Sequence, residues 1–173
     1  MKRRKVDLTR RTRKHQLGDF GEDRALELLK GFDEIEKMPP NFPFFDLMAK
    51  QGARRLLIPV RTRNKFTAKG NLKKNNYNLY TKNGHFASAS KVATFFGAEI
   101  VWVAVTVDTM TKRFWAYMGD VDPSKPPLPT YIPMHPDHDV PKHDCLAGDV
   151  PHEAISASWS NIEKTVSANE VQP

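Results

Sequence analysis

The segment from Phe44 to Phe66 contains the residue types that act on phosphate groups. Asp46 lies in one apolar run, and a basic cluster that includes Arg61 ends the next apolar run. Upstream, Glu22 supplies a second carboxylate in a stretch with helical spacing. Carboxylates bind Mg²⁺, and a bound Mg²⁺ can activate water and stabilise charge on a phosphodiester. A guanidinium stays protonated, so Arg61 can clamp a phosphate but cannot act as a general base. The candidate catalytic residues are therefore Glu22, Asp46 and Arg61.

A run of basic residues without a single acid occupies positions 61 to 82. Asparagine and tyrosine side chains are interleaved with the cations, a mixture suited to contacting a sugar-phosphate backbone and stacking on bases. The alternative is a flexible loop whose charges are only solvated. Beyond Arg61, the candidate nucleic-acid-binding residues are Arg63, Lys65, Lys69, Lys73, Lys74, Tyr77 and Lys82.

The overall charge points to the same kind of partner. Lys and Arg number 27 against 20 Asp and Glu, which gives a formal net charge of +7 over 173 residues. This excess favours nucleic acid as a partner, and a generally basic surface is the alternative. The single cysteine, Cys145, excludes an internal disulfide and suits a reducing compartment. No apolar run approaches the roughly 20 residues that cross a bilayer, so we expect a soluble cytoplasmic protein without membrane contacts.

The elements that must position these residues can be predicted from periodicity and turn residues. Apolar spacing between residues 17 and 30, followed by Gly31, predicts a helix. A short strand is expected at 32–38, and 44–49 and 55–61 read as two strands joined at Gln51-Gly52. Ser88 or Ser90 is expected to cap a second helix that runs through Phe96.

The remaining elements complete one domain. Residues 100–107 are apolar almost without interruption, as in a central strand buried on both faces, and 113–118 are expected to be its antiparallel neighbour. We divide the chain into a basic arm at 1–16, a compact domain at 17–120 and a proline-rich extension at 121–173. Prolines forbid long helices and central strands in that extension, so it is expected to drape over the domain or stay mobile.

With these elements in place, residues 17 to 118 resemble the PD-(D/E)XK nuclease superfamily, which includes Holliday junction resolvases. Gly18 and Gly21-Glu22 are similar to the glycine and glutamate of the family's first helix. Phe45-Asp46-Leu47 is similar to the strand that offers an aspartate, and Pro59-Val60-Arg61 occupies the place of Glu-x-Lys. The resemblance implies an α/β, restriction-endonuclease-like core. A mixed central sheet is flanked by helices in the order helix, three strands, helix, two strands. It also implies Mg²⁺ without an organic cofactor, DNA more than RNA as partner, and a homodimer.

Two positions depart from that family pattern. Pro59 has no carboxylate to offer a metal ion, although its carbonyl and that of Val60 remain. Arg61 replaces the lysine. A weak Mg²⁺ site built on Asp46 and Glu22 is the way in which activity would survive. The alternatives are a solvent-facing helix position for Glu22 and a local turn or cap role for Asp46.

Three functions follow from these residues. The first is a nucleic-acid-binding protein on a nuclease-like scaffold with a degenerate, weak or inactive metal site. The second is an active Mg²⁺-dependent endonuclease that uses Glu22 and Asp46. The third is a protein-interaction subunit whose basic surface contacts an acidic partner.

Overall fold

A computed structural model describes residues 13–67, 69–73, 76–77, 84–121, 130–131, 144–156 and 159. The expected sites at Lys74 and Lys82, most of the basic arm, and a large part of the proline-rich extension lie outside the described residues. For Tyr77 only the backbone is described, in a short strand β5 (Asn76–Tyr77) that pairs with β8 (Thr130–Tyr131).

The long strand β6 (Glu99–Asp108) is the centre of the fold. From Ile100 to Asp108 every residue is buried, which confirms the prediction of a central strand covered on both faces. On one side β6 pairs with β7 (Arg113–Asp120) in antiparallel register, from Val101↔Asp120 to Asp108↔Arg113. On the other side it pairs in parallel with the two short strands β3 and β4, so the sheet is mixed.

Strands β3 (Arg54–Ile58) and β4 (Val60–Asn64) form one extended run that Pro59 interrupts. Both keep the same offset against β6, since Leu57 is opposite Ile100 and Val60 is opposite Val103. The Val103 N–H donates to the Pro59 carbonyl at 3.0 Å, whereas Pro59 itself has no N–H to donate. The proline therefore breaks the ladder without shifting its register.

The other edge of β3 carries a pair of antiparallel strands. Strand β2 (Leu47–Gln51) pairs with β3 through a tight turn at Gly52, where φ is 60°, and β1 (Glu34–Lys37) pairs with β2. A positive φ at this turn is a conformation that glycine adopts without strain. The expected hairpin around Gln51-Gly52 is thus confirmed.

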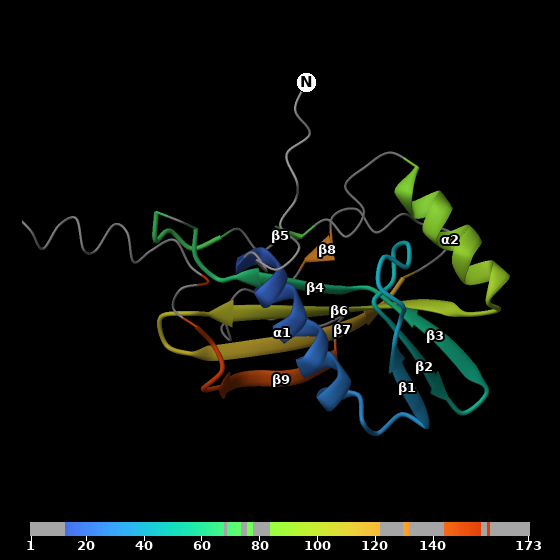
Figure 1. Cartoon of the computed structure of the whole chain (residues 1–173), viewed down its shortest axis with the longest axis horizontal. Helices are drawn as coiled ribbons and strands as arrows, with labels where there is room; N and C mark the ends of the chain where they lie inside the picture. Colours follow the sequence, from blue (N-terminus) through green and yellow to red (C-terminus); the bar gives the residue numbers. More distant parts are fainter. Residues whose placement is uncertain are drawn as a thin grey trace, which may run out of the picture.

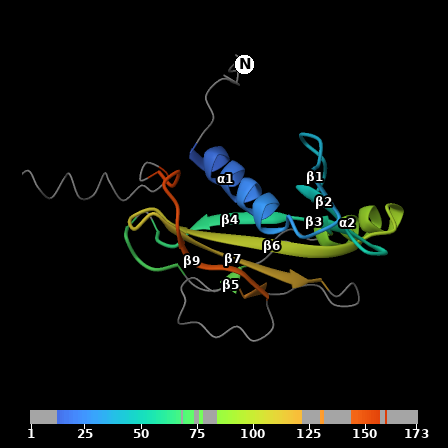
Figure 2. The ribbon, with the colours of Figure 1, turned by 90° about the horizontal axis from the view of Figure 1, so that it is seen from below.

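The resulting sheet has seven strands, and its last member is β9 (Asp144–Pro151). The order is β1-β2-β3-β6-β7-β9, with β4 paired to β6 beside that path. Figure 1 shows β1 to β3 at one end of β6 and β4 beside its other half. Helix α1 (Arg13–Leu28) covers one face, as Figure 2 shows from the side, and α2 (His85–Phe95) packs on the opposite face. The predicted α/β class, with a mixed central sheet flanked by helices, is confirmed. The element order differs from the prediction, because Pro59 divides the expected third strand into β3 and β4 and because β5, β8 and β9 were not predicted.

Helix α2 begins earlier than its serines suggested. It starts at His85 after Gly84, whose φ of 81° turns the chain into the helix, and no side chain caps its first turn. The prediction that Ser88 or Ser90 is the cap was wrong, because Gly84 already makes the turn that starts the helix. The other end agrees with the prediction, since Gly97 follows the helix with φ 58°.

The described part of the proline-rich extension adds to the domain. Strand β9 (Asp144–Pro151) pairs with β7 at the edge of the sheet and ends on a proline, which an edge strand tolerates. After it, Ile155 is buried in the same hydrophobic cluster as α1, and Trp159 packs against that cluster. Composition alone did not indicate this strand. Within the part of the chain that the structure describes, no helix is long and apolar enough to cross a membrane.

Candidate functional site

Helix α1 lies very close to strand β4, and a glycine makes this approach possible. A Cβ atom added at Gly21 would collide with the Oγ1 and Cβ atoms of Thr62. Leu17 and Phe20 from the helix join Val60 from the strand in one buried cluster. The contact holds Glu22, the next residue of the helix, within electrostatic range of Asp46, which directly precedes β2.

Asp46 directly precedes Leu47, the first residue of β2 that pairs with β3. Its N–H donates to the Ile58 carbonyl at 3.0 Å, and its carbonyl accepts from the Met38 N–H at 2.8 Å. Because Pro59 has no N–H, the next backbone donor after Ile58 is the Val60 N–H, and it donates to the Asp46 Oδ2 atom at 2.7 Å. The carboxylate thus takes the role of a ladder acceptor for a residue 14 positions along the chain, which differs from the local turn or cap role considered as the alternative.

Arg61 binds the same carboxylate. Its Nη1 atom donates to Asp46 Oδ2 at 3.2 Å and to the Val60 carbonyl at 3.0 Å. Both side chains are 29 % exposed, so this pair lies partly in the interior. Burial raises the pKa of the Asp46 carboxyl above its ordinary value, and the bonds from the Val60 N–H and Arg61 only partly oppose this rise.

Glu22 has a different cation as its neighbour. Lys37, at the end of β1, places its Nζ atom 3.6 Å from Glu22 Oε2 and 2.8 Å from Asp23 Oδ1. Burial raises the pKa of Glu22, and repulsion from the Asp46 charge raises it further, so the two carboxylates lie within electrostatic range. Lys37 was not among the predicted site residues, because no local spacing links a strand lysine to a helix carboxylate.

These contacts decide whether the residues suit a magnesium ion. Mg²⁺ prefers an octahedron of oxygen ligands with one or two carboxylates free to bind it. Here Asp46 is bound by Arg61, and Glu22 lies beside Lys37. Among the described residues, no group of three or more His, Cys, Asp or Glu side chains could hold a metal ion. In this arrangement the residues do not fit Mg²⁺.

The basic segment after β4 folds back as a hairpin rather than as an unstructured loop over residues 65–67 and 69–73. Phe66 and Leu72 form an antiparallel bridge, and the Lys73 N–H donates to the Lys65 carbonyl at 2.9 Å. Gly70, with φ 78°, makes the turn. The hairpin therefore holds Lys73 beside the end of β4.

Lys65 is engaged inside the fold. Its Nζ atom lies 3.5 Å from Asp108 Oδ2, with side-chain exposures of 17 % and 4 %. The same ammonium lies over the Trp115 ring, 4.9 Å from the ring centre. A cation held in this way contributes to stability through its ion pair and its aromatic contact.

Arg63 and Lys73 lie close enough to repel each other. Burial lowers the pKa of the Lys73 ammonium, and the positive charge of Arg63 lowers it further. Lys69 is exposed at the tip of the hairpin. Arg61 and Arg63 alternate with Thr62 along β4 and so leave the sheet on the same face, opposite to α1. Arg63 and Lys73, with the exposed Lys69 at the tip of the same hairpin, form what we call the β4 basic surface.

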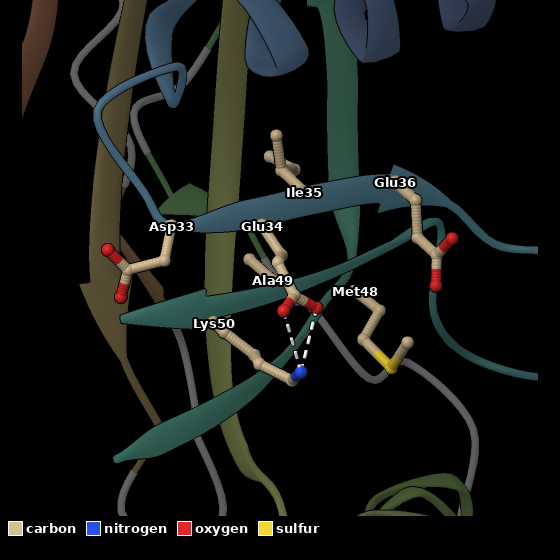
Figure 3. A pocket seen from close by; sticks show the side chains of 7 residues that line it. All are labelled: Asp33, Glu34, Ile35, Glu36, Met48, Ala49 and Lys50. Atoms are coloured by element: carbon tan, nitrogen blue, oxygen red, sulfur yellow. Dashed lines mark hydrogen bonds and ion pairs between the residues drawn. The ribbon is translucent and has the colours of Figure 1, made fainter. Parts of the chain in front are cut away.

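A separate pocket lies over the antiparallel pair β1 and β2 (Figure 3). In it the Glu34 carboxylate is bound by Lys50 at 2.7 Å, and both side chains are exposed. The remaining lining residues are Asp33, Ile35, Glu36, Met48 and Ala49. An exposed strand face with a surface ion pair accounts for these acids.

Comparison with known proteins adds a distant likeness among solved structures. No family model and no curated protein sequence matches the chain. Among solved structures it is similar to Hjc, a Holliday junction resolvase from the archaeal hyperthermophile Archaeoglobus fulgidus, at 20 % identity. The match covers 63 % of this chain and 93 % of that chain, with a TM-score of 0.35. The fold class of this chain rests on its own strand pairing, and its function has to be argued from its own residues.

Proposed function

We propose that this protein binds nucleic acid through the β4 basic surface and that its nuclease-like carboxylate site is degenerate. One observation carries the proposal: Arg63 leaves β4 on the face opposite to α1, and the hairpin after β4 brings Lys73 back beside it. An anion bound beside two like charges offsets the repulsion between them. A chain of phosphates is the anion that matches several cations in a row.

The proposal extends to the polymer and the assembly. DNA is the favoured nucleic acid, and a homodimer would present two such surfaces to one duplex or junction. A cytoplasmic location belongs to the same proposal, since Cys145 is an exposed free thiol that a reducing compartment keeps reduced. Light scattering at the salt concentration of the binding assay measures the assembly.

Salt-dependent binding tests this function. Fluorescence anisotropy with duplex, four-way-junction and single-stranded oligonucleotides should give an affinity that falls steeply as salt rises. Replacing both Arg63 and Lys73 by glutamine should weaken binding about tenfold and make the slope of log K against log salt shallower by about 1.8, or about 0.9 per lost phosphate contact.

A matched control removes two positive charges elsewhere. Lys50 and Arg54 are exposed and paired with Glu34 and Glu99, on the strands away from β4. Their double glutamine variant should keep the wild-type slope. If both double variants lost the same affinity, the net charge of the protein and not the β4 basic surface would explain the loss. An affinity that does not change with salt for any oligonucleotide would favour a protein-interaction subunit instead.

A second candidate function is Mg²⁺-dependent phosphodiester hydrolysis with Glu22 and Asp46. The two carboxylates lie within electrostatic range, since burial and then the charge of Asp46 raise the pKa of Glu22. A metal ion could join them only after Arg61 and Lys37 give up their contacts. Cleavage assays on plasmid and junction DNA with Mg²⁺ or Mn²⁺ test it, beside Asp46→Ala. Cleavage that disappears in that variant would establish the enzyme, and no cleavage by the wild type would leave binding as the function.

A further inference from the structure

One nitrogen atom of Arg61 joins an oxygen atom of Asp46, which directly precedes β2, to the carbonyl oxygen of Val60 in β4. Its Nη1 carries two hydrogens, and it donates to Asp46 Oδ2 at 3.2 Å and to the Val60 carbonyl at 3.0 Å. Pairing between β2 and β3 ends at Leu47↔Ile58, so β2 does not reach the Val60 carbonyl. The Val60 carbonyl is thus left for Arg61, and both oxygen atoms face the same Nη1 atom beside the start of β4.

A carboxylate and a backbone carbonyl that converge on one point are ligands of the kind that hard cations bind. In this chain a charged nitrogen already occupies that point. We propose that the Arg61 guanidinium is a permanent internal cation that fills this oxygen site and keeps divalent metal ions out of it. The inference rests on the contacts of Arg61, and it holds whether or not the chain binds nucleic acid.

Charge explains why the exclusion would be effective. A metal ion bound to Asp46 Oδ2 and the Val60 carbonyl would have to take the place of the Arg61 nitrogen. The displaced guanidinium would keep its charge at any practical pH and would stay attached beside the ion. Lys37, next to Glu22, adds a further positive charge on the helix side of the site. Removing the Arg61 side chain should therefore uncover a binding site for a divalent cation.

Manganese binding tests this inference without any measurement of activity. Free Mn²⁺ is followed by electron paramagnetic resonance during titration of the full chain, and calorimetry repeats the titration with Mg²⁺. Arg61→Ala should bind Mn²⁺ at least about tenfold more tightly than the wild type. Tenfold is the lower end of the change in metal affinity that substitutions next to metal ligands typically cause. Adding Asp46→Asn to Arg61→Ala should abolish the gain.

Arg63→Ala is the matched control, because it removes the same charge two residues along the same strand and should leave Mn²⁺ affinity at the wild-type value. Arg61→Met keeps the aliphatic stem without the charge and should reproduce the gain if Arg61→Ala does not fold, with circular dichroism reporting the fold. Three outcomes would overturn the inference: a wild type that binds as tightly as Arg61→Met, an equal gain in Arg63→Ala, or a gain that survives Asp46→Asn. None of these would alter the oligonucleotide test of the proposed function.

Discussion

Gly21 of helix α1 packs directly against Thr62 of strand β4, with no space for a side chain between them. Because Gly21 has no Cβ atom, helix α1, which carries Glu22, can lie directly against strand β4, which carries Arg61. A larger residue at position 21 should push α1 away from the sheet and so change the distance between Glu22 and Asp46.

Gly21→Ala should lower the free energy of unfolding by about 1–3 kcal/mol, because the added methyl group overpacks the contact with Thr62. Urea denaturation measures the change. Gly18→Ala is the control: it lies in the same helix with nothing within 4 Å of its added Cβ, so it should be neutral or stabilising by up to about 1 kcal/mol. Equal effects of the two alanines would contradict the close packing at Gly21.

Glu22→Gln should change how stability depends on pH. Because the pKa of Glu22 is raised in the folded state, the folded chain holds this proton more tightly than the unfolded chain. The contribution of this group to stability is thus complete below its ordinary pKa of 4.5 and is lost as pH rises through the raised value. Urea denaturation at several pH values from 4.5 to neutrality should show a flatter profile for Glu22→Gln than for the wild type.

Glu27→Gln provides the comparison for that experiment, since it removes one carboxylate from the exposed side of the same helix. If Glu27→Gln flattened the profile as much as Glu22→Gln, the position of Glu22 beside Asp46 and Lys37 would not be the cause.

Lys65→Met should reduce stability by about 1–3 kcal/mol, because it leaves the buried Asp108 carboxylate without its cation. The loss is kept below that of a fully buried pair because Lys65 is partly exposed, and because Asp108 also accepts from the Met110 and Thr111 N–H groups. Thermal and urea unfolding measure it. Lys69→Met, at the exposed tip of the hairpin, should change stability by less than about 0.5 kcal/mol. A Lys65 variant as stable as the wild type would show that its ammonium is free for other partners.

Ile155→Ala should cost about 2–5 kcal/mol, as expected for a large aliphatic side chain removed from a packed core. Val150→Ala, in β9 and 36 % exposed, should cost less than about 1 kcal/mol. Denaturation of the full-length variants checks both values. If Ile155→Ala were as mild as Val150→Ala, the segment after β9 would not be part of the core.

Several features of this molecule could be predicted because their causes are local. The apolar run at 100–107 indicates a strand buried on both faces by its composition alone, and Gly52 adopts the positive φ of a tight turn without help from distant residues. Asp46 and Arg61 were expected on adjoining strands, and strand pairing brings their side chains to 3.2 Å. Local pattern is thus enough to bring the aspartate and the arginine together.

Other features depend on contacts between distant parts of the chain. Lys37 reaches Glu22 and Asp23 only because β1 folds back beside α1, and no motif encodes that pairing. Lys65 looked like the rest of the basic run, but Asp108 and Trp115 hold its ammonium inside the fold. Strand β9 has a mixed composition, and only the free edge of β7 makes it a strand.

The position of Trp159 has a consequence for how the chain is made. The Trp159 ring lies 5.3 Å from the ring centre of Phe20, in the first helix, and Ile155 is buried in the same cluster. During translation, Phe20 leaves the ribosome long before its last packing partners are synthesised. Helix α1 therefore emerges with part of its apolar side uncovered, and the nascent chain is open to chaperones and to aggregation until Ile155 and Trp159 have emerged as well.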